Sequence, residues 1–472
     1  MKFILNGKGG LKVDLVFENT NLDNKVFNHL KEKELFTGKL KQIYVNTYEE
    51  VAFVGLGNSE TITLNEIREV FFDLAKELDS KKVSEITLEV PKFEKFCCKG
   101  VAGAISEGLL QSEYNFNKFT VDKKERTELT VNYVTCSENA AKGIEESETL
   151  MKSVFITRDL VNLPSNYIYP ETLANKAKEI LSPLGVKVTI YDKKQIKEMG
   201  MEAFYSVGKG SDNEPRLIVM EYENNPESNE RLGLVGKGIT YDSGGYSLKP
   251  NDGMKTMFCD MGGAATVIGS IHAMASSKVK ANVVGVVAAC ENAVSGHSYK
   301  PGDIIGSLSG KTIEVDNTDA EGRVTLADSV YYTATTMKAT KIIDLATLTG
   351  ACLVALGEVY SGSVTNNQEF FNQVKEAADK SGEKIWQLPT DPMFAKQNKS
   401  KVADIKNTGG RLAGTITAGM FVGEFNNNLP WVHLDIAGTA YLSSPYSYLP
   451  HGATGIHVKT LYRLVAKGLN CK

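Results

Sequence analysis

The chain has 472 residues, and its 53 lysines and arginines against 57 aspartates and glutamates give a formal net charge of −4. This slightly acidic balance offers no electrostatic argument for nucleic acid or an anionic membrane as the main partner. Hydrophobic residues make up 42% of the chain and charged residues 23%, which excludes disorder as the dominant state. Length alone predicts two or three domains, at roughly 150 residues each. The six histidines are few, which at first sight argues against a zinc enzyme.

Cysteine usage and the N-terminal segment predict a cytoplasmic location. The seven cysteines have no regular spacing and no CxxC pair, so we expect reduced thiols rather than a zinc cluster or a disulfide framework. The first residues, MKFILNGKGGLKVDLVFE, show no sustained apolar segment of the kind found in signal peptides. The longest strongly apolar run, 281–290, is about half of the roughly 20 residues that a membrane helix needs. We therefore expect no membrane association.

The first 135 residues alternate short strand and helix patterns, which predicts a small α/β domain. Apolar side chains recur at helical spacing over 66–79, as in an amphipathic helix. We expect strands at 50–57, 83–90 and 128–136 and helices at 66–79 and 100–111. This part of the chain carries no cluster of functional polar residues, so we expect the chemistry to lie elsewhere.

A charged helical stretch from Ser137 to about Asn162 predicts a linking helix, with a domain boundary near residue 150. A new alternation begins at Pro170, which stands early in a helix. Further strands are expected at 186–191, 216–222, 232–236, 281–289, 312–315, 341–345 and 431–436, and helices at 259–276, 320–338, 366–380, 413–426 and 457–469. Such alternation predicts a mostly parallel sheet covered on both faces. The predicted fold is therefore α/β, with a small N-terminal domain (1–150) and a larger C-terminal domain (151–472) whose central sheet is flanked by helices.

Charged residues gather where predicted strands end in the second domain. A strand runs into Lys237 and Asp242, a glycine pair then leads to Lys249, and Asp260 stands just before a helix. The carboxyl ends of parallel strands form the crevice in which α/β proteins place their sites. We therefore expect these side chains to line a functional site.

A second polar segment lies at 315–323, again where a strand ends and a helix begins. Asp319, Glu321 and Arg323 are two residues apart, so an extended or looped backbone could point all three in the same direction. Together with the preceding segment, these residues supply four carboxylates. Such a set suits two divalent ions such as Mn²⁺, Zn²⁺ or Mg²⁺, and without cations the carboxylates would repel one another. A neutral lysine amine can also bind a metal.

Other interpretations fit the same residues. Asp260 could cap the helix that follows, and residues 319–322 could form a solvated turn. The glycine pair followed by Lys249 could bind phosphate. Spacing by itself leaves the metal site and these alternatives open.

Two strings of sequence resemble the leucine aminopeptidase (cytosol aminopeptidase) family of two-metal exopeptidases. They are VGKGITYDSGGYSLKP at 235–250, followed by Asp260, and NTDAEGR at 317–323, which is similar to the highly specific family signature. The similarity covers the whole second domain. The N-terminal domain shows no resemblance that we can name, as expected for the variable half of this family.

The resemblance implies five metal ligands, namely Lys237, Asp242, Asp260, Asp319 and Glu321. Asp242 and Glu321 would bridge two ions, Lys237 and Asp260 would complete one site, and Asp319 would complete the other through its side chain and backbone carbonyl. The expected ions are Zn²⁺ or Mn²⁺, with Mg²⁺ or Co²⁺ as alternatives.

Two catalytic residues are also implied by the resemblance. Lys249 would polarise the scissile carbonyl and stabilise the developing oxyanion. Arg323 would hold a bicarbonate-like anion that serves as general base for the water between the metals. The implied substrate contacts are Met257, Asn317, Thr347, Leu348 and Gly350.

The implied protein is an aminopeptidase that removes an N-terminal residue, with a leucine-like preference, from peptides. The family assembles as homohexamers, so the resemblance implies self-association, with an oligomerisation or regulatory role for the N-terminal domain. One rival is a DNA-binding regulator, because some relatives bind DNA, although the acidic balance and lack of a basic helix disfavour it as the main role. A second is an inactive homologue, which the presence of all seven implied metal and catalytic residues disfavours.

Overall fold

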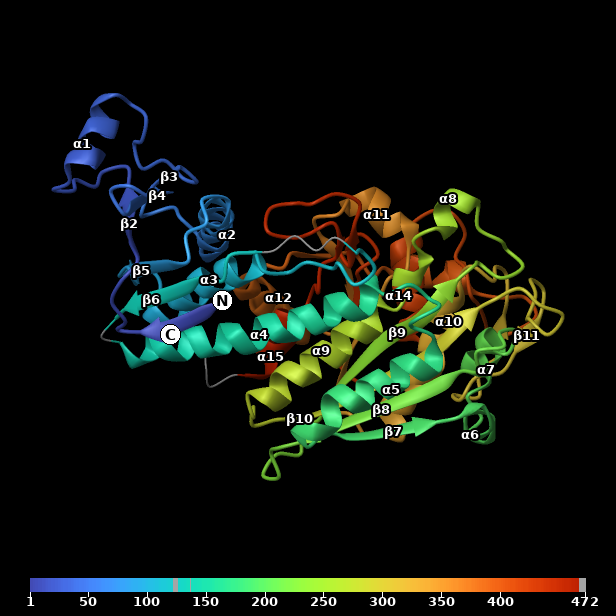
Figure 1. Ribbon diagram of the computed structural model, residues 1–472. Coiled ribbons are helices and arrows are strands. Elements are labelled where there is room, and N and C mark those ends of the chain that lie inside the picture. The colour runs from blue at the N-terminus through green and yellow to red at the C-terminus, as the bar shows by residue number, and fades with distance from the viewer. Residues whose placement is uncertain (122–125, 136, 467–472) are drawn as a thin grey trace. The chain divides into compact units, whose positions relative to one another are not determined.

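The computed structural model describes residues 1–121, 126–135 and 137–466 (Figure 1). These residues form two compact units. The first comprises Met1–Lys152 and Pro445–Pro450, and the second comprises Ser153–Ser444 and the described residues 451–466. The predicted linking helix is α4 (Glu138–Asn162), and the division between the units falls within it.

A six-stranded sheet forms the centre of the first unit. Its order is β1-β6-β5-β2-β4-β3, parallel throughout except at the edge strand β3. The strands are β1 (Lys2–Leu5), β2 (Leu11–Phe17), β3 (Ile43–Asn46), β4 (Val51–Gly57), β5 (Glu85–Glu89) and β6 (Thr130–Val134). Three of the expected strands are thus present, whereas β1, β2 and β3 escaped sequence analysis.

Helices α1 (Lys25–Glu32), α2 (Leu64–Ser80) and α3 (Cys98–Gln111) accompany this sheet. Thr63 begins α2 with a capping box, because its hydroxyl accepts the Glu66 backbone N–H while the Glu66 carboxylate accepts that of Thr63. The apolar face of α2, including Ile67, Phe71 and Leu74, is buried in the core of this unit. The amphipathic pattern at 66–79 therefore predicted both the helix and its buried face.

An eight-stranded sheet forms the centre of the second unit, in the order β15-β14-β17-β13-β9-β10-β8-β7. Its four central strands are mutually parallel. Strand β8 runs antiparallel to both of its neighbours, whereas β14 runs antiparallel to β17 and parallel to β15. The strands are β7 (Lys187–Tyr191), β8 (Arg216–Glu223), β9 (Leu232–Asp242), β10 (Asn282–Asn292), β13 (Lys341–Ala346), β14 (Ser361–Thr365), β15 (Ile385–Gln387) and β17 (Trp431–Asp435).

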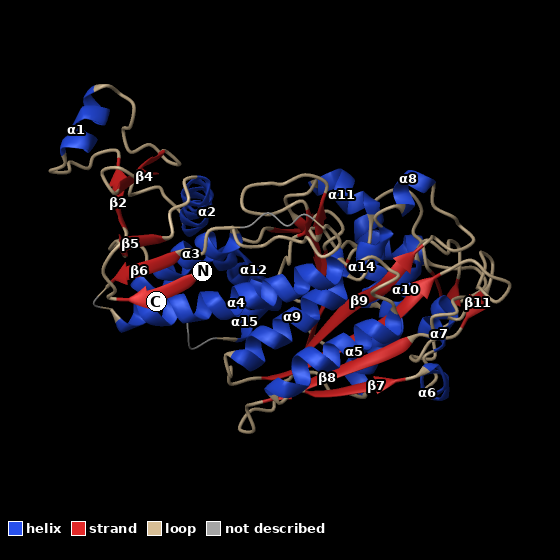
Figure 2. Cartoon of the chain, in the orientation of Figure 1, coloured by secondary structure: helices blue, strands red, loops and turns tan. Residues whose placement is uncertain are grey.

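Helices cover both faces of this sheet (Figure 2). Gly236 and Lys237 are consecutive residues of β9, so they lie on opposite faces of the sheet. Helix α9 packs on the face of Gly236, and α10 packs on the face of Lys237. The helices of this unit are α5 (Pro170–Leu181), α6 (Lys193–Glu198), α7 (Glu202–Gly208), α8 (Asn251–Met254), α9 (Gly262–Ser276), α10 (Glu321–Thr335), α11 (Gly350–Leu356), α12 (Gln368–Ser381), α13 (Pro392–Ala395), α14 (Gly414–Gly423) and α15 (Val458–Val465). The α/β fold class and the two-part architecture are therefore confirmed.

Several local predictions need correction. The strand expected at 312–315 is the two-residue β12 (Ile313–Glu314), which pairs with β11 (Ile304–Ile305) and β16 (Ile405–Lys406) in a separate sheet. A further short pair is β18 (Tyr441–Leu442) with β19 (Gly452–Ala453). The helix expected from residue 259 begins at Gly262, because Met257–Cys259 form a 3₁₀ turn. The ends of two predicted elements, at 136 and 467–469, lie outside the described residues.

The remaining sequence-based expectations concern cysteines and membranes. Cys98, Cys259, Cys290 and Cys352 are free, but Cys97 is disulfide-bonded, so the expectation of thiols throughout is wrong there. Among the described residues, no helix combines the length and apolar character needed to cross a membrane.

Candidate active site

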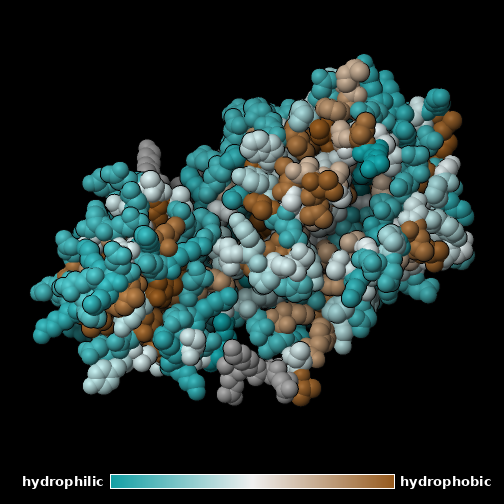
Figure 3. All heavy atoms as spheres, turned by 90° about the horizontal axis from the view of Figure 1, so that it is seen from above, coloured by the Kyte–Doolittle hydropathy of each residue, from teal (hydrophilic) through white to brown (hydrophobic). Residues whose placement is uncertain are grey.

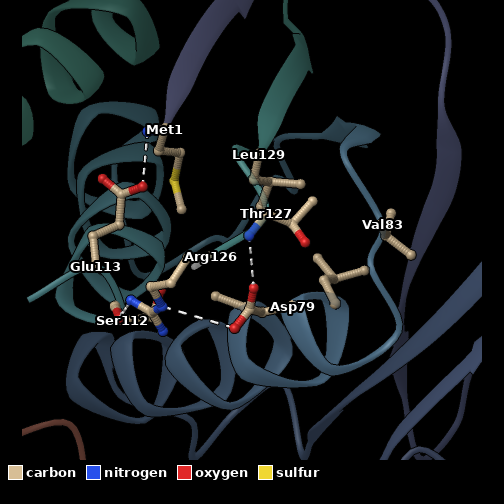
Figure 4. Close-up of a pocket in the computed structure, with 10 residues that line it drawn as sticks. Met1, Asp79, Val83, Ser112, Glu113, Arg126, Thr127 and Leu129 are labelled. Carbon is tan, nitrogen blue, oxygen red and sulfur yellow. Dashed lines mark hydrogen bonds and ion pairs between the residues drawn. The ribbon is translucent and has the colours of Figure 1, made fainter. Parts of the chain in front are cut away.

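A cavity of about 450 Å³ opens in the second unit at the carboxyl edge of its sheet. Its wall includes the end of β9 and the segments that follow β13 and β17, three parallel strands whose carboxyl ends meet at this edge. Cavities of this size are typical of small-ligand sites. By contrast, a pocket in the first unit measures only about 30 Å³, and its Asp79 carboxylate already accepts the Thr127 backbone N–H (Figure 4). The larger cavity is therefore the candidate site.

Lys237 bridges two carboxylates beneath this cavity. Its Nζ lies 2.7 Å from Asp260 Oδ2 and 2.8 Å from Glu321 Oε1, and it donates a hydrogen bond of 2.9 Å to the Thr347 carbonyl. The Thr347 hydroxyl in turn donates to Asp260 Oδ1 at 2.7 Å. All three charged side chains are at most 5% exposed. Segments far apart in the chain thus meet at one buried ammonium.

Lys249 forms a second bridge nearer to solvent. Its Nζ lies 2.9 Å from Asp242 Oδ2 and 2.5 Å from Asp319 Oδ1. The Lys249 side chain is 17% exposed and that of Asp319 is 34% exposed. The site therefore contains a buried half around Lys237 and a more accessible half around Lys249.

The pKa values reflect this crowding. Burial and the neighbouring Asp242 carboxylate raise the pKa of Glu321, and burial raises that of Asp260 against the opposing effect of Lys237. Burial would lower the pKa of Lys237, but Asp260 and Glu321 raise it above the ordinary lysine value. Burial therefore disfavours the charged form of both carboxylates, and nearby positive charge stabilises it. A bound cation would supply such positive charge.

Glycines make room for this arrangement. A Cβ at Gly322 would lie 2.4 Å from Lys237 Cε, so a side chain there would displace the lysine stem. Gly244 has φ of 84°, and a Cβ there would lie 2.8 Å from Asp319 Oδ1. The glycine-rich strings allow the lysines and carboxylates to approach one another closely.

Two asparagines outside the recognised strings hold the site loops. Asn292, at the end of β10, donates 2.8 Å to Asp242 Oδ1 and 2.9 Å to the Thr318 carbonyl. Asn407 is fully buried, accepts the backbone N–H groups of Asp316 and Asn317, and donates to the carbonyls of Asn317 and Ala320. Sequence analysis missed both residues. The position of Asn292 at a strand end beside β9 was a usable signal, whereas nothing in the sequence points to Asn407.

Arg323 lies in the first turn of α10 and lines the cavity. It is 8% exposed and donates 2.9 Å from Nη1 to the Asn407 carbonyl, while its Nε has no hydrogen-bond partner among the described residues. Burial lowers its pKa to about 10. A buried guanidinium with a free donor is suited to hold an anion.

The structure brings every sequence-predicted site residue together. The five implied substrate contacts line the cavity: Met257, Asn317, Thr347, Leu348 and Gly350. The implied ligands and catalytic residues line it too, except Glu321, which lies behind Lys237. Thr347 and Asn317 also have structural contacts, because Thr347 bonds Asp260 and the Asn317 amide oxygen accepts the Asp319 backbone N–H.

The alternatives left open by the sequence find no support. Helix α9 begins after Met261 with no side-chain cap, and the Asp260 carboxylate is directed to Lys237 instead. Glu321 is 1% exposed, so residues 319–322 are no solvated turn. Lys249 is engaged by two carboxylates, an environment that repels phosphate.

A metal ion fits this donor set. Asp242, Asp319 and Glu321 each offer an oxygen atom within 4.8 Å of the other two, and Glu321 Oε2 has no hydrogen-bond partner among the described residues. Oxygen ligands of this kind suit hard or borderline divalent cations. A carboxylate-rich cavity at a sheet edge that can hold divalent cations is an arrangement suited to metal-dependent hydrolases.

Comparison with known proteins narrows this class. The catalytic domain of the cytosol aminopeptidase family matches residues 155–462, and the N-terminal domain of the same family matches residues 14–123. Probable cytosol aminopeptidases of Treponema denticola and Clostridium tetani are 54% and 49% identical to this chain, over 99% and 100% of it and the whole of each relative.

Solved structures with the same fold include enzymes of this kind. A mutant of tomato leucine aminopeptidase superposes with a TM-score of 0.88 at 32% identity, covering 99% of this chain and 96% of its own. The bottromycin maturation enzyme BotP superposes with a TM-score of 0.89 at 27% identity, covering 98% and 100%, and has also been solved in complex with Mn.

The chain belongs to the cytosol aminopeptidase family. It is a metal-dependent aminopeptidase, which hydrolyses the bond after the N-terminal residue of a peptide. The N-terminal half, for which sequence analysis named no relative, is also recognisable as the N-terminal domain of this family.

Proposed function

We propose that this chain removes leucine-like N-terminal residues from peptides by means of two divalent cations, Zn²⁺ or Mn²⁺, with Mg²⁺ or Co²⁺ as alternatives. The residues that would hold them are Lys237, Asp242, Asp260, Asp319 and Glu321. The observation that carries the proposal is the convergence of four carboxylates and two lysines on one cavity. Divalent ions held there would lower the pKa of water and polarise the scissile carbonyl.

Lys237 can serve as a ligand only as a neutral amine. Its ammonium is held by Asp260 and Glu321, so it must release a proton when cations take over those carboxylates. The binding of divalent cations should therefore be accompanied by proton release, and the affinity for these cations should fall at low pH.

Lys249 and Arg323 would act on the substrate side of the site. The Lys249 ammonium, at the more exposed half of the site, can donate a hydrogen bond to the carbonyl oxygen as negative charge develops on it. The free Nε of Arg323 can hold a bicarbonate-like anion, which would accept the proton of the attacking water.

A leucine-like preference is supported by the apolar part of the cavity wall. Met257, Leu348 and Leu353 line it, with small residues such as Gly350 and Ala437 leaving room between them. An aliphatic side chain of the substrate would bury apolar surface against these groups, which favours it over a charged one.

Self-association to a homohexamer is the proposed assembly. Hydrophobic groups interrupt the hydrophilic surface in Figure 3, and Val354 and Leu412 are 89% and 78% exposed. Exposed apolar side chains of this kind are available for burial between copies. The first unit would serve assembly or regulation, and we propose a cytoplasmic location.

The test is hydrolysis of leucine p-nitroanilide together with metal analysis. Chelation should abolish activity, and added Mn²⁺ or Zn²⁺ should restore it. Asp260→Ala and Glu321→Ala should each lower activity at least a thousandfold, on the order of the loss expected when a catalytic centre is dismantled, and should lower metal content.

Asp252→Ala is the matched control, because this carboxylate is exposed and does not line the cavity. It should retain activity and metal content. The ligand assignment is wrong if the purified Asp260 or Glu321 variants keep wild-type metal content and activity. Light scattering that reports a monomer at micromolar concentration would overturn the hexamer.

A further inference from the structure

Four cationic side chains line the cavity: Lys237, Lys249, Arg323 and Arg411. The two lysines are each engaged by two carboxylates, and Arg323 is buried and bonded to the Asn407 carbonyl. Arg411 differs from all three. It is exposed, and within the described part of the chain it forms no ion pair and no side-chain hydrogen bond. Among the four cations that line this cavity, Arg411 is therefore the one whose guanidinium has no ion pair or hydrogen bond with a described residue.

The backbone holds Arg411 at the cavity wall. Gly410 before it has φ of 88°, and Ala413 after it has φ of 53°, a left-handed conformation that is uncommon for a residue with a Cβ. Ala413 then begins α14, and Asn407 anchors the other end of the segment through its buried amide. Backbone strain of this kind is found where surrounding structure imposes it, often at functional sites.

Thr408, Gly410, Arg411 and Gly414 all line the same cavity. A segment of five residues between Asn407 and Ala413 thus forms one wall of the site, and Arg411 is the charged group on it. A guanidinium that is exposed to the cavity and lacks a protein partner is suited to a ligand carboxylate, which it can bind with two parallel hydrogen bonds.

A peptide substrate supplies such a carboxylate. Its N-terminal amine and first peptide bond must lie at the carboxylate-rich end of the cavity for hydrolysis, so the remainder of a short peptide extends along the wall. Each residue adds at most about 3.6 Å, so only in a short peptide does the C-terminus remain within the cavity. Longer peptides carry their α-carboxylate beyond it.

We propose that Arg411 binds the C-terminal α-carboxylate of short peptides and thereby favours di- and tripeptides over longer or C-terminally blocked substrates. This inference rests on the proposed aminopeptidase function. The same guanidinium could bind a carboxylate in the side chain of the second substrate residue, and the experiment separates these two sources.

The experiment compares kcat/KM for Leu-Gly and Leu-Gly-Gly with that for Leu-Gly-amide, in wild type and in Arg411→Ala. We expect the ratio of free acid to amide to fall about tenfold in the variant for at least one of the two peptides, as for loss of one charge-assisted hydrogen-bonded pair. The effect should appear mainly in KM. In wild type the same ratio should fall as salt is raised, because the guanidinium is exposed to solvent.

Matched variants exclude a general structural effect. Lys401→Ala removes an exposed cation that does not line the cavity, and it should leave the ratio unchanged. Arg411→Gln keeps most of the side-chain volume without the charge, and it should lower the ratio as Arg411→Ala does.

Three outcomes overturn the inference. The ratio could stay the same in both Arg411 variants, or it could fall equally in Lys401→Ala. Alternatively, Arg411→Ala could impair hydrolysis of Leu-Asp-amide while leaving the Leu-Gly ratio unchanged, which would assign the guanidinium to a side-chain carboxylate. Failure of the proposed function itself looks different, because wild type would then hydrolyse none of the peptides in the presence of Mn²⁺ or Zn²⁺.

Discussion

Two buried clusters of charge, one in each unit of this chain, differ in their balance of charge. In the first unit, Arg68 on α2 and Glu107 on α3 form one matched pair, 2.6 Å apart and at most 2% exposed. In the second unit, Lys237 and Lys249 face four carboxylates, so negative groups outnumber the lysines that neutralise them. In the matched pair the two charges offset each other, whereas the surplus of carboxylates in the second unit needs cations to complete it. The same type of interaction thus serves packing in one unit and chemistry in the other.

The largest expected effect concerns the matched pair. Arg68→Ala leaves the Glu107 carboxylate buried without this cation, which should lower the free energy of unfolding by about 3–5 kcal/mol. Denaturant unfolding, together with hydrogen exchange of α2 and α3, measures this loss. Replacing both partners by Met and Leu should recover most of it.

Lys81→Ala is the control for this prediction, because Lys81 follows α2 and pairs with Glu77 where both side chains are exposed. It should change stability by less than about 1 kcal/mol. An equal loss in Lys81→Ala and Arg68→Ala would remove the contrast between a buried and an exposed pair.

The next effect concerns the unmatched cluster. Lys249→Ala should lower kcat by about a hundredfold to a thousandfold, because one positively charged donor to the developing oxyanion is lost. Metal content should remain near that of wild type, since Lys249 is not among the proposed ligands. Lys255→Ala, an exposed lysine that does not line the cavity, should keep wild-type kcat. A Lys249 variant with full kcat would refute the catalytic assignment.

Asn407 offers a third, smaller effect. Asn407→Ala removes four hydrogen bonds that hold the segment carrying Asp319, so kcat/KM should fall by about 10- to 100-fold, as for other groups that orient metal ligands. Asn407→Asp should not rescue activity, because it lacks the two donors. Asn426→Ala changes another buried asparagine away from the cavity and should leave kcat within about twofold of wild type.

The smallest effect tests a third kind of buried charge. Asp328 on α10 accepts the backbone N–H groups of Phe204 and Leu308 at 2.9 and 2.8 Å, and burial raises its pKa to about 7. The folded protein therefore takes up a proton between about pH 7 and pH 4 that the unfolded chain does not, so this group adds stability as pH falls through that window. Relative to Asp328→Asn, the Tm of wild type should rise by on the order of 2–4 °C between pH 8 and pH 5. A wild-type Tm that falls relative to that of Asp328→Asn on acidification would contradict the sign.

Sequence analysis located the candidate site more completely than it described the architecture. All twelve predicted site residues lie in or directly behind one cavity. Seven of the twelve belong to two short strings, 235–250 and 317–323, and an eighth, Asp260, stands just before a helix, so residue type and spacing are informative there. The resemblance to a family supplied the others. Strands β14 and β15, at one end of the larger sheet, were missed, since they are short and their pairing depends on neighbours far along the chain. The strand expected at 312–315 was placed in the wrong sheet for the same reason.

Supporting residues were the hardest to foresee. The Asn407 side chain forms hydrogen bonds with backbone atoms of the site loop, roughly 90 residues earlier in the chain. An isolated asparagine has no sequence pattern that indicates such a role. Arg411 was not among the predicted site residues. That it forms no ion pair with a described residue becomes informative only when the partners of the other three cavity cations are known.

By itself the sequence determined the α/β class, the carboxylates and lysines of the site, and the resemblance to a family of metal-dependent aminopeptidases. Only the tertiary structure decided that Lys237 pairs with Asp260 and Glu321 while Lys249 pairs with Asp242 and Asp319. The physical reason lies in the sheet. Strand β9 carries both Lys237 and Asp242 between β10 and β13, and this non-local pairing sets which loops reach each side chain. The sequence therefore indicates which lysines and carboxylates form the site, and the order of the strands determines which of them pair with one another.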